Sequence, residues 1–266
     1  MAGAQRTSFA RRHPARTVTA FLILFLLYQS AEGIGQRLLG LMAVQAGLMI
    51  AMLIAAWPVG RFLLRGHGYR AYGLGWRRDV PILLGLGILI AFVGRAAGLW
   101  LGVVTHVYTV GPLAPGAGPH GAMIVAGLGL ALVSTFVPSI AEDILTRGLW
   151  WRVGGPWLRG VRFVLISSLI YLLNHIYRLD RGPSEWVELF CFGLAYATAM
   201  SLTGTLWAAV GLHWGWNLAN TLLDQYVAVE GVPGQAAWTS AVANLLMLVI
   251  VLALPLYRRR DESPVD

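Results

Sequence analysis

The sequence predicts an all-α protein, a polytopic bundle of transmembrane helices, and three observations lead to this prediction. Apolar runs recur along the whole chain, of which 57% is hydrophobic. Only 12% of the residues are charged, against roughly 25% in ordinary soluble domains. The arginines gather in short segments between the apolar runs. The low charge excludes a soluble globular fold, and the recurrence of apolar runs predicts a single membrane domain, 1–266.

The apolar runs divide into about eight spans, since about 20 apolar residues are needed to cross the hydrocarbon core of a bilayer. We expect these spans near 18–36, 38–60, 81–104, 121–143, 161–177, 186–203, 205–222 and 237–257. The many glycines within them are typical of closely packed membrane helices.

The arginines also predict the orientation of the chain. They are frequent before the first span, after the second, after the fourth and after the last, and sparse in most of the alternate loops. The positive-inside rule then places both termini in the cytoplasm, with the protein in the inner (plasma) membrane. The formal net charge of +8 is therefore interpreted as contact with the anionic lipid of the bilayer, and no nucleic-acid partner is expected.

Ionisable side chains at membrane depth are the candidate functional residues, because each costs about 3 kcal/mol or more unless it is paired or solvated. Glu142, Asp143 and Arg147 lie at the end of the fourth span. Asp143 and Arg147 are four residues apart and can pair on one helix face. Glu142 points about 100° away and is free for another partner. The alternative is that all three are interfacial charges at a helix end.

Two further pairs of polar residues recur at helical spacing. Tyr171 and His175 share a face of the fifth span, and His213 and Asn217 share a face of the seventh. Each pair also has a simpler interpretation, since a histidine at a span end is often a packing residue and polar pairs often join helices by hydrogen bonds.

The remaining unusual residues point to structure. Arg95 lies well inside the third span, and we expect an ion pair with Glu32 of the first. Cys191 is the sole cysteine, so an internal disulfide is excluded, and its apolar surroundings indicate inert packing.

Together, Glu142, His175, His213 and Asn217 come from three spans and predict one polar pocket. A carboxylate can take a proton from a water that an imidazole orients. A second histidine and an amide can donate hydrogen bonds to a developing oxyanion. These residues predict hydrolysis within the membrane.

The three motifs resemble those of the CAAX protease and bacteriocin-processing (CPBP) family, in which EExxxR, FxxxH and HxxxN follow one another on core helices. Here they are Glu142-Asp143-x-x-x-Arg147, Tyr171-x-x-x-His175 and His213-x-x-x-Asn217, and the resemblance covers about 120–222, the expected catalytic core helices. Asp143 replaces the second glutamate and Tyr171 replaces phenylalanine.

The resemblance implies an intramembrane glutamic endopeptidase similar to the type II CAAX prenyl endopeptidases. Glu142 would be the general base, His175 would hold the water, and His213 with Asn217 would form the oxyanion site. Asp143, Arg147 and Tyr171 would be supporting residues. No cofactor is expected. Zinc is the alternative, with Glu142, His175 and His213 as its ligands.

The expected partner is a membrane-associated peptide or protein that reaches the site from the cytoplasmic side. Two other functions stay open. One is a non-enzymatic immunity or scaffold protein of the same family. The other is a small transporter, which usually shows internal repeats that this sequence lacks.

Overall fold

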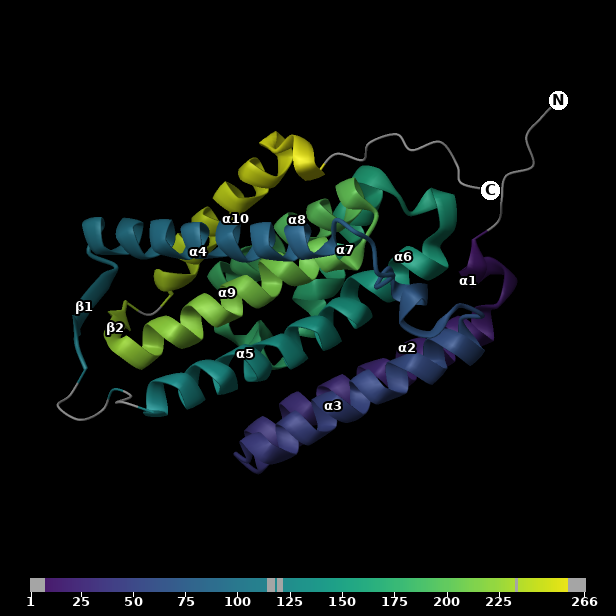
Figure 1. The fold of residues 1–266 in the computed structure, drawn as a ribbon, viewed down its shortest axis with the longest axis horizontal. Coiled ribbons are helices and arrows are strands. Elements are labelled where there is room, and N and C mark those ends of the chain that lie inside the picture. The colour runs from purple at the N-terminus through teal and green to yellow at the C-terminus, as the bar shows by residue number, and fades with distance from the viewer. Residues whose placement is uncertain (1–7, 114–117, 119–121, 233, 258–266) are drawn as a thin grey trace.

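The computed structural model describes residues 8–113, 118, 122–232 and 234–257, and these form a helical bundle with one small sheet (Figure 1). The prediction of an all-α membrane fold is confirmed. The α-helices are α1 (Phe9–Arg12), α2 (Pro14–Ser30), α3 (Met42–Pro58), α4 (Val80–Val104), α5 (Ala122–Asp143), α6 (Leu149–Gly154), α7 (Gly160–Asn174), α8 (Pro183–Thr203), α9 (Leu206–Tyr226) and α10 (Ala236–Ala253). The π-helical segments are η1 (Ala31–Leu38), η2 (Val59–Leu63) and η4 (Ile144–Gly148). The 3-10 segments are η3 (Gly68–Tyr72), η5 (Gly155–Trp157), η6 (Ile176–Arg181) and η7 (Pro255–Tyr257).

Six helical segments of the described chain are long and apolar enough to cross a membrane, so the chain is a multi-pass membrane protein. They are Pro14–Leu38, Met42–Leu63, Val80–Val104, Met123–Trp157, Pro183–Thr203 and Ala236–Ala253. The other two expected spans, 161–177 and 205–222, correspond to α7 and α9. Helix α7 is apolar but only 15 residues long, and α9 carries several polar side chains.

Two stretches differ from the expected loops. The fourth span was expected to end at 143, but the helix continues through η4 and α6 to Gly154. Two strands, β1 (Tyr108–Pro112) and β2 (Val227–Gly231), pair antiparallel with Tyr108 opposite Gly231. They lie in two loops that were expected to face the same side of the membrane, and they join the ends of α4 and α9. The expected loop 105–120 falls partly outside the described residues.

Local sequence signals set several helix ends. Pro14 and Pro183 begin α2 and α8. The first N–H groups of a helix have no partner within it, so a proline, which has no N–H, is well suited to this position. Gly204 ends α8 in the left-handed conformation, with φ of 68°. The Thr205 hydroxyl then accepts a hydrogen bond from the Trp207 N–H and starts α9.

Helices α4 and α9 lie side by side in the bundle (Figure 1). Glycines allow this contact. A Cβ atom on Gly87 would lie 2.7 Å from the carbonyl carbon of Gly211, and one on Gly215 would lie 2.6 Å from Cα of Ile88. Both distances are shorter than real Cβ contacts, so these positions require glycine. The close approach fixes α9, which carries His213.

The segment 61–80 connects the second and third expected spans and carries several aromatic side chains. Tyr69 and Trp76 are exposed, but Tyr72 is fully buried and donates a hydrogen bond to the Ala56 carbonyl at 2.9 Å. The Gly73 carbonyl accepts a hydrogen bond from the Leu206 N–H at 3.0 Å. This segment therefore closes one end of the bundle.

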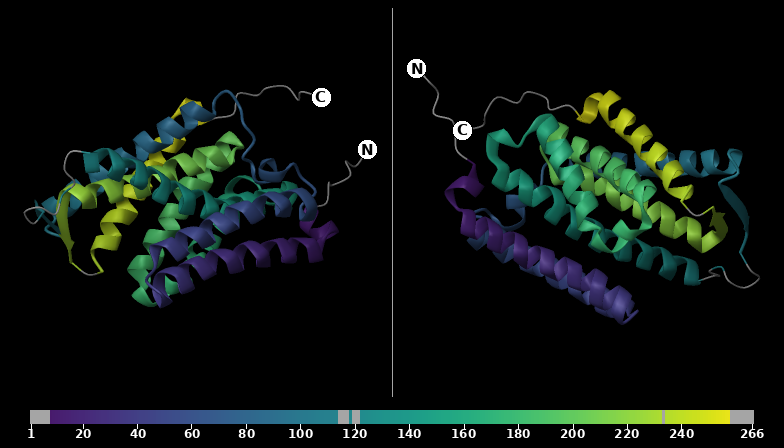
Figure 2. Two further views of the ribbon diagram at one scale, coloured as in Figure 1. Left: turned by 60° about the horizontal axis from the view of Figure 1, so that its bottom comes forward. Right: turned by 180° about the vertical axis from the view of Figure 1, so that it is seen from behind.

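The bundle has two distinct ends (Figures 1 and 2). We call the end formed by α1, η3 and α6 the arginine-rich end. Helices α2, α4, α7 and α9 run away from it, and α3, α5, α8 and α10 run back toward it. We call the other end, which includes the sheet, the α2–α3 turn and η6, the opposite end.

Candidate active site

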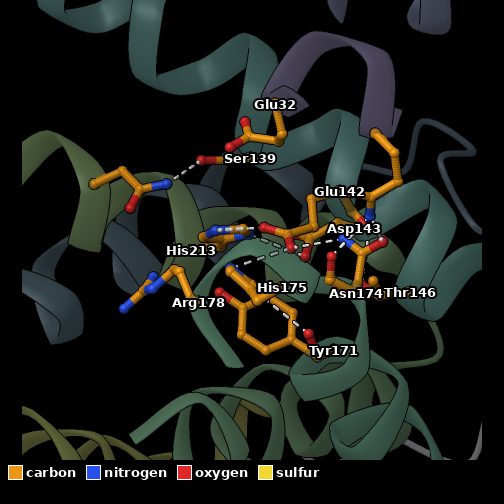
Figure 3. Close-up of polar contacts among 12 residues, drawn as sticks. Glu32, Ser139, Glu142, Asp143, Thr146, Tyr171, Asn174, His175, Arg178 and His213 are labelled. Carbon is orange, nitrogen blue, oxygen red and sulfur yellow. Dashed lines mark hydrogen bonds and ion pairs between the residues drawn. The ribbon is translucent and has the colours of Figure 1, made fainter. Parts of the chain in front are cut away.

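Glu142 and Asp143 are the last two residues of α5, directly before the π-helical segment η4. Only 4% of Glu142 and none of Asp143 is exposed. Neighbouring residues on a helix point about 100° apart, so the two carboxylates point in different directions and approach different nitrogens of His213 (Figure 3). Glu142 faces His175 and His213. Single-turn π-helical segments are frequent at functional sites.

The carboxylate of Asp143 links Arg147 to His213. Arg147 Nη1 donates to Asp143 Oδ1, and Nδ1 of His213 lies 3.1 Å from the same oxygen. The guanidinium of Arg147 is fully buried and lies 4.6 Å from the ring centre of Tyr171 and 5.1 Å from that of Tyr196. The two aromatic faces stabilise this cation where water is excluded. The sequence did not reveal the contact between Asp143 and His213.

Both histidines present a ring nitrogen to Glu142. Nε2 of His175 lies 3.5 Å from Oε1, and Nε2 of His213 lies 3.6 Å from Oε2. These distances exceed those of direct hydrogen bonds and suit a shared water. Nδ1 of His175 lies 2.9 Å from the Tyr171 carbonyl, which can only accept. Nδ1 of His175 therefore carries the proton, and in the neutral ring Nε2 offers a lone pair toward Glu142.

A buried chain of amides also binds the Glu142 carboxylate, at the oxygen that faces His175, and sequence reasoning missed it. Asn174 Nδ2 donates to Glu142 Oε1 at 3.1 Å. Gln29 Nε2 in turn donates to Asn174 Oδ1 at 3.0 Å and to the Asn174 carbonyl at 2.7 Å. Both amides are polar residues within apolar runs, and this feature of the sequence could have identified them. Asn174 directly precedes His175, and Gln29 lies late in the first span.

Asn217 lines the same cavity but has a different bonding partner. Its Nδ2 donates to Ser139 Oγ at 3.0 Å, one turn before Glu142 on α5. The structure thus brings Glu142, His175 and His213 together around one point, and holds Asn217 on the adjacent wall.

The predicted ion pair between Arg95 and Glu32 is wrong. Arg95 Nε donates to Asn220 Oδ1 at 2.5 Å, and its guanidinium lies 6.0 Å from the Tyr108 ring centre. Glu32 accepts from Gln45 Nε2 at 3.1 Å. The reason lies in the packing, because α4, which carries Arg95, contacts α9 and α10, whereas η1, which carries Glu32, contacts α3.

The candidate site is the floor of a cavity of about 700 Å³, a size within the range of small-molecule and peptide pockets. Its wall is mostly polar and comes from α2, η1, α5, α7, η6, α8 and α9. The lining residues are Tyr28, Glu32, Gln36, Arg37, Pro138, Glu142, Tyr171, Asn174, His175, Tyr177, Arg178, Arg181, Glu188, Phe192, Tyr196, His213, Trp216, Asn217 and Asn220.

Charged side chains of η6 and α8 form one rim of this cavity. Arg178 pairs with Glu185 and, at 3.7 Å, with Glu188, and Arg181 pairs with Glu185 at 3.6 Å. Burial lowers the pKa of Arg178, but the two carboxylates outweigh burial and raise the pKa overall. Arg178 therefore keeps its positive charge beside the cavity.

The cavity extends from Glu142 toward Arg37 of η1 and Arg181 of η6, which belong to the opposite end of the bundle. The arginine-rich end, with the N-terminal helix α1, lies on the other side. The expectations that the termini lie in the cytoplasm and that the site opens toward it stay predictions.

The proposed zinc ligands do not form a metal-ligand cluster. Within residues 8–113, 118, 122–232 and 234–257, no group of three histidine, cysteine, aspartate or glutamate side chains has a geometry suited to a metal ion. His175 and His213 each approach Glu142, at the water-sharing distances given above.

Comparison with known proteins identifies the segment that carries these residues. Residues 124–219 match the family model of the Rce1-like type II CAAX prenyl endopeptidases, which form a protease family. No curated protein and no solved structure shows significant similarity to the chain. The matched segment covers a little over a third of the chain and contains Glu142, His175 and His213 with their supporting residues. Residues 124–219 therefore carry a match to the Rce1-like family of type II CAAX prenyl endopeptidases, within the CPBP family.

Proposed function

We propose that the protein is an intramembrane endopeptidase of the CAAX protease type. In this proposal it hydrolyses a peptide bond of a membrane-associated peptide or protein with a water activated by Glu142. The observation that supports it most directly is the convergence of one carboxylate and two imidazoles, from α5, α7 and α9, on the floor of a polar cavity.

The first step is activation of the water. A water between Glu142 and His175 donates one hydrogen bond to the carboxylate and the other to the lone pair on Nε2 of His175. Glu142 then takes the proton as the water oxygen bonds to the carbonyl carbon of the scissile peptide. When the carbon–nitrogen bond breaks, Glu142 returns that proton to the leaving amine.

The second requirement is stabilisation of the tetrahedral oxyanion. Nδ1–H of His213 donates to Asp143. In this proposal the ring is doubly protonated, and its Nε2–H donates to the oxyanion. Asn217 uses one N–H for Ser139, and its amide has a second to donate into the cavity.

No metal is part of the proposed mechanism. Incubation of the purified protein with a chelator should leave peptide cleavage unchanged, and elemental analysis should find no stoichiometric zinc. Loss of cleavage on chelation, with recovery on adding zinc, would assign Glu142, His175 and His213 as ligands instead.

The decisive test is Glu142→Gln, which keeps the shape of the side chain and removes the base. We expect cleavage of a peptide library by the purified protein to fall by about 100-fold or more, and the same for His175→Ala. Glu230→Gln, an exposed carboxylate of β2, is the matched control and should retain full activity. Full cleavage by both Glu142→Gln and His175→Ala would disprove this mechanism.

A non-enzymatic immunity or scaffold function is the competing outcome of a cellular test. Complementation of a deletion strain by Glu142→Gln as fully as by the wild type would favour that function over proteolysis. We place the protein in the inner (plasma) membrane, where such a strain can be assayed.

A further inference from the structure

The cavity has one closed end, and that end is the arginine-rich one. Below Glu142, the side chains of Asp143 and Arg147 are fully buried. Next along this helix, a Cβ on Gly148 would lie 2.7 Å from Cβ of Tyr72, so η3 packs directly against η4. The Gly73 carbonyl also accepts hydrogen bonds from the Leu206 N–H and the Thr205 hydroxyl, both at 3.0 Å. The floor of the site is thus sealed from this side by segment 61–80.

The open direction follows from where the lining residues lie along their helices. On α2 and η1 they come from the second half, and on α7 from the last turn. On α8 they run from Glu188, near its start, to Tyr196, just past its middle, and on α9 they continue past His213 to Asn220. Each of these helices places the cavity between the depth of Glu142 and the opposite end. The mouth therefore lies among η1, η6 and the start of α8.

The arginines assign the two ends to the two sides of the membrane. The arginine-rich end holds most of those described: Arg11, Arg12, Arg16, Arg61, Arg65, Arg70, Arg77, Arg78, Arg152, Arg159 and Arg162. The mouth holds Arg37, Arg178 and Arg181. The last two pair with glutamates of α8, and Arg37 donates to the Tyr177 carbonyl. By the positive-inside rule, the arginine-rich end is cytoplasmic.

We propose that the cavity opens to the extracytoplasmic face of the membrane, and that its substrate is an extracytoplasmic segment of a membrane-associated polypeptide. The inference rests on the proposed peptidase function for its substrate class, while the direction of the opening stands independently of it. The peptide enters between η1 and η6 and descends toward Glu142. A cytoplasmic peptide would have to displace Tyr72 and the hydrogen bonds of Gly73.

Cysteine labelling in cells tests the direction without using activity. In a Cys191→Ala background, Asp180→Cys marks η6 at the mouth, and His67→Cys marks the segment that seals the other end. Both positions are exposed, and neither substitution removes an arginine. We expect a membrane-impermeant maleimide to label Asp180→Cys in intact cells, and His67→Cys only after the membrane is permeabilised. Glu230→Cys of β2 is a second extracytoplasmic marker with the same expected result as Asp180→Cys.

Two results would overturn the inference. One is labelling of His67→Cys in intact cells, and the other is protection of both Asp180→Cys and Glu230→Cys until permeabilisation. Either would place the mouth in the cytoplasm and leave the proposed hydrolysis untouched. Conversely, full peptide cleavage by both Glu142→Gln and His175→Ala would disprove the proposed hydrolysis and leave the labelling pattern unchanged. The two failures are therefore distinguishable.

Discussion

Nδ1 of His213 and Oδ1 of Asp143 lie 3.1 Å apart, and that same carboxylate oxygen also receives Arg147. The contact ties a motif of α9 to a motif of α5 inside a region without solvent. In the proposed mechanism it keeps a proton on Nδ1 of His213 and fixes the orientation of the ring.

Asp143→Asn should therefore lower kcat/KM by about 100-fold or more, because the amide no longer holds the His213 ring in the tautomer and orientation that the mechanism needs. It also leaves Arg147 without a carboxylate, and loss of one partner of a buried pair costs about 3–5 kcal/mol. Thermal denaturation in detergent separates the two effects. Asp143→Glu keeps the charge and should retain more activity than the amide. Wild-type cleavage by folded Asp143→Asn would contradict this role.

Asn174 should act as a positioning residue for Glu142. Asn174→Ala removes the donor to Oε1, and we expect kcat to fall by about 10-fold with little change in KM, since substrate contacts remain. Asn174→Asp is nearly isosteric but places a second negative charge beside the carboxylate, so it should be the worse variant. Steady-state kinetics with one peptide measures both. A change confined to KM would argue against positioning.

Tyr171 should act through its ring and not through its hydroxyl. The ring centre lies 4.7 Å from that of His175 and 5.9 Å from that of His213, and Arg147 lies over its face. Tyr171→Phe keeps these contacts and restores the residue typical of the family motif, so activity should stay within about 3-fold of wild type. Tyr171→Ala should cost about 3–5 kcal/mol of stability. A large loss in the phenylalanine variant would show that the hydroxyl takes part.

Gly87 should be required for the packing of α4 on α9. The Cβ of Gly87→Ala would lie 2.7 Å from the backbone of Gly211, and forced overpacking of this kind costs about 1–3 kcal/mol. Gly85 is the matched control on the same helix, since a Cβ there meets nothing within 4 Å. Gly85→Ala should be neutral or slightly stabilising. Equal melting temperatures for the two variants in detergent would refute the argument.

The sequence predicted the helical membrane fold well, because hydropathy depends on local composition. It was less successful wherever a helix departs from a uniform apolar run. Helix α7 is short and ends at Asn174, and the fourth span continues beyond 143 because Leu145, Leu149 and Val153 are buried against neighbouring helices. The strands β1 and β2 pair across more than 100 residues of sequence, a relationship that local patterns do not contain.

The candidate site shows the same limit. The spacing within each motif indicated which side chains share a helix face, and the structure places Glu142 opposite both histidines. The partners from other helices were not foreseeable, because helix pairing is not encoded in periodicity. Gln29 and Asn174 were missed for this reason, and Arg95 was paired with Glu32 although its neighbour across the interface is Asn220.

The length of α7 has a consequence for the lipid around the protein. Its 15 residues extend about 22 Å at 1.5 Å per residue, whereas the hydrocarbon core of a bilayer is about 30 Å thick. A helix this short matches only part of that thickness, so we expect lipid headgroups to lie deeper beside His175 than beside the longer helices.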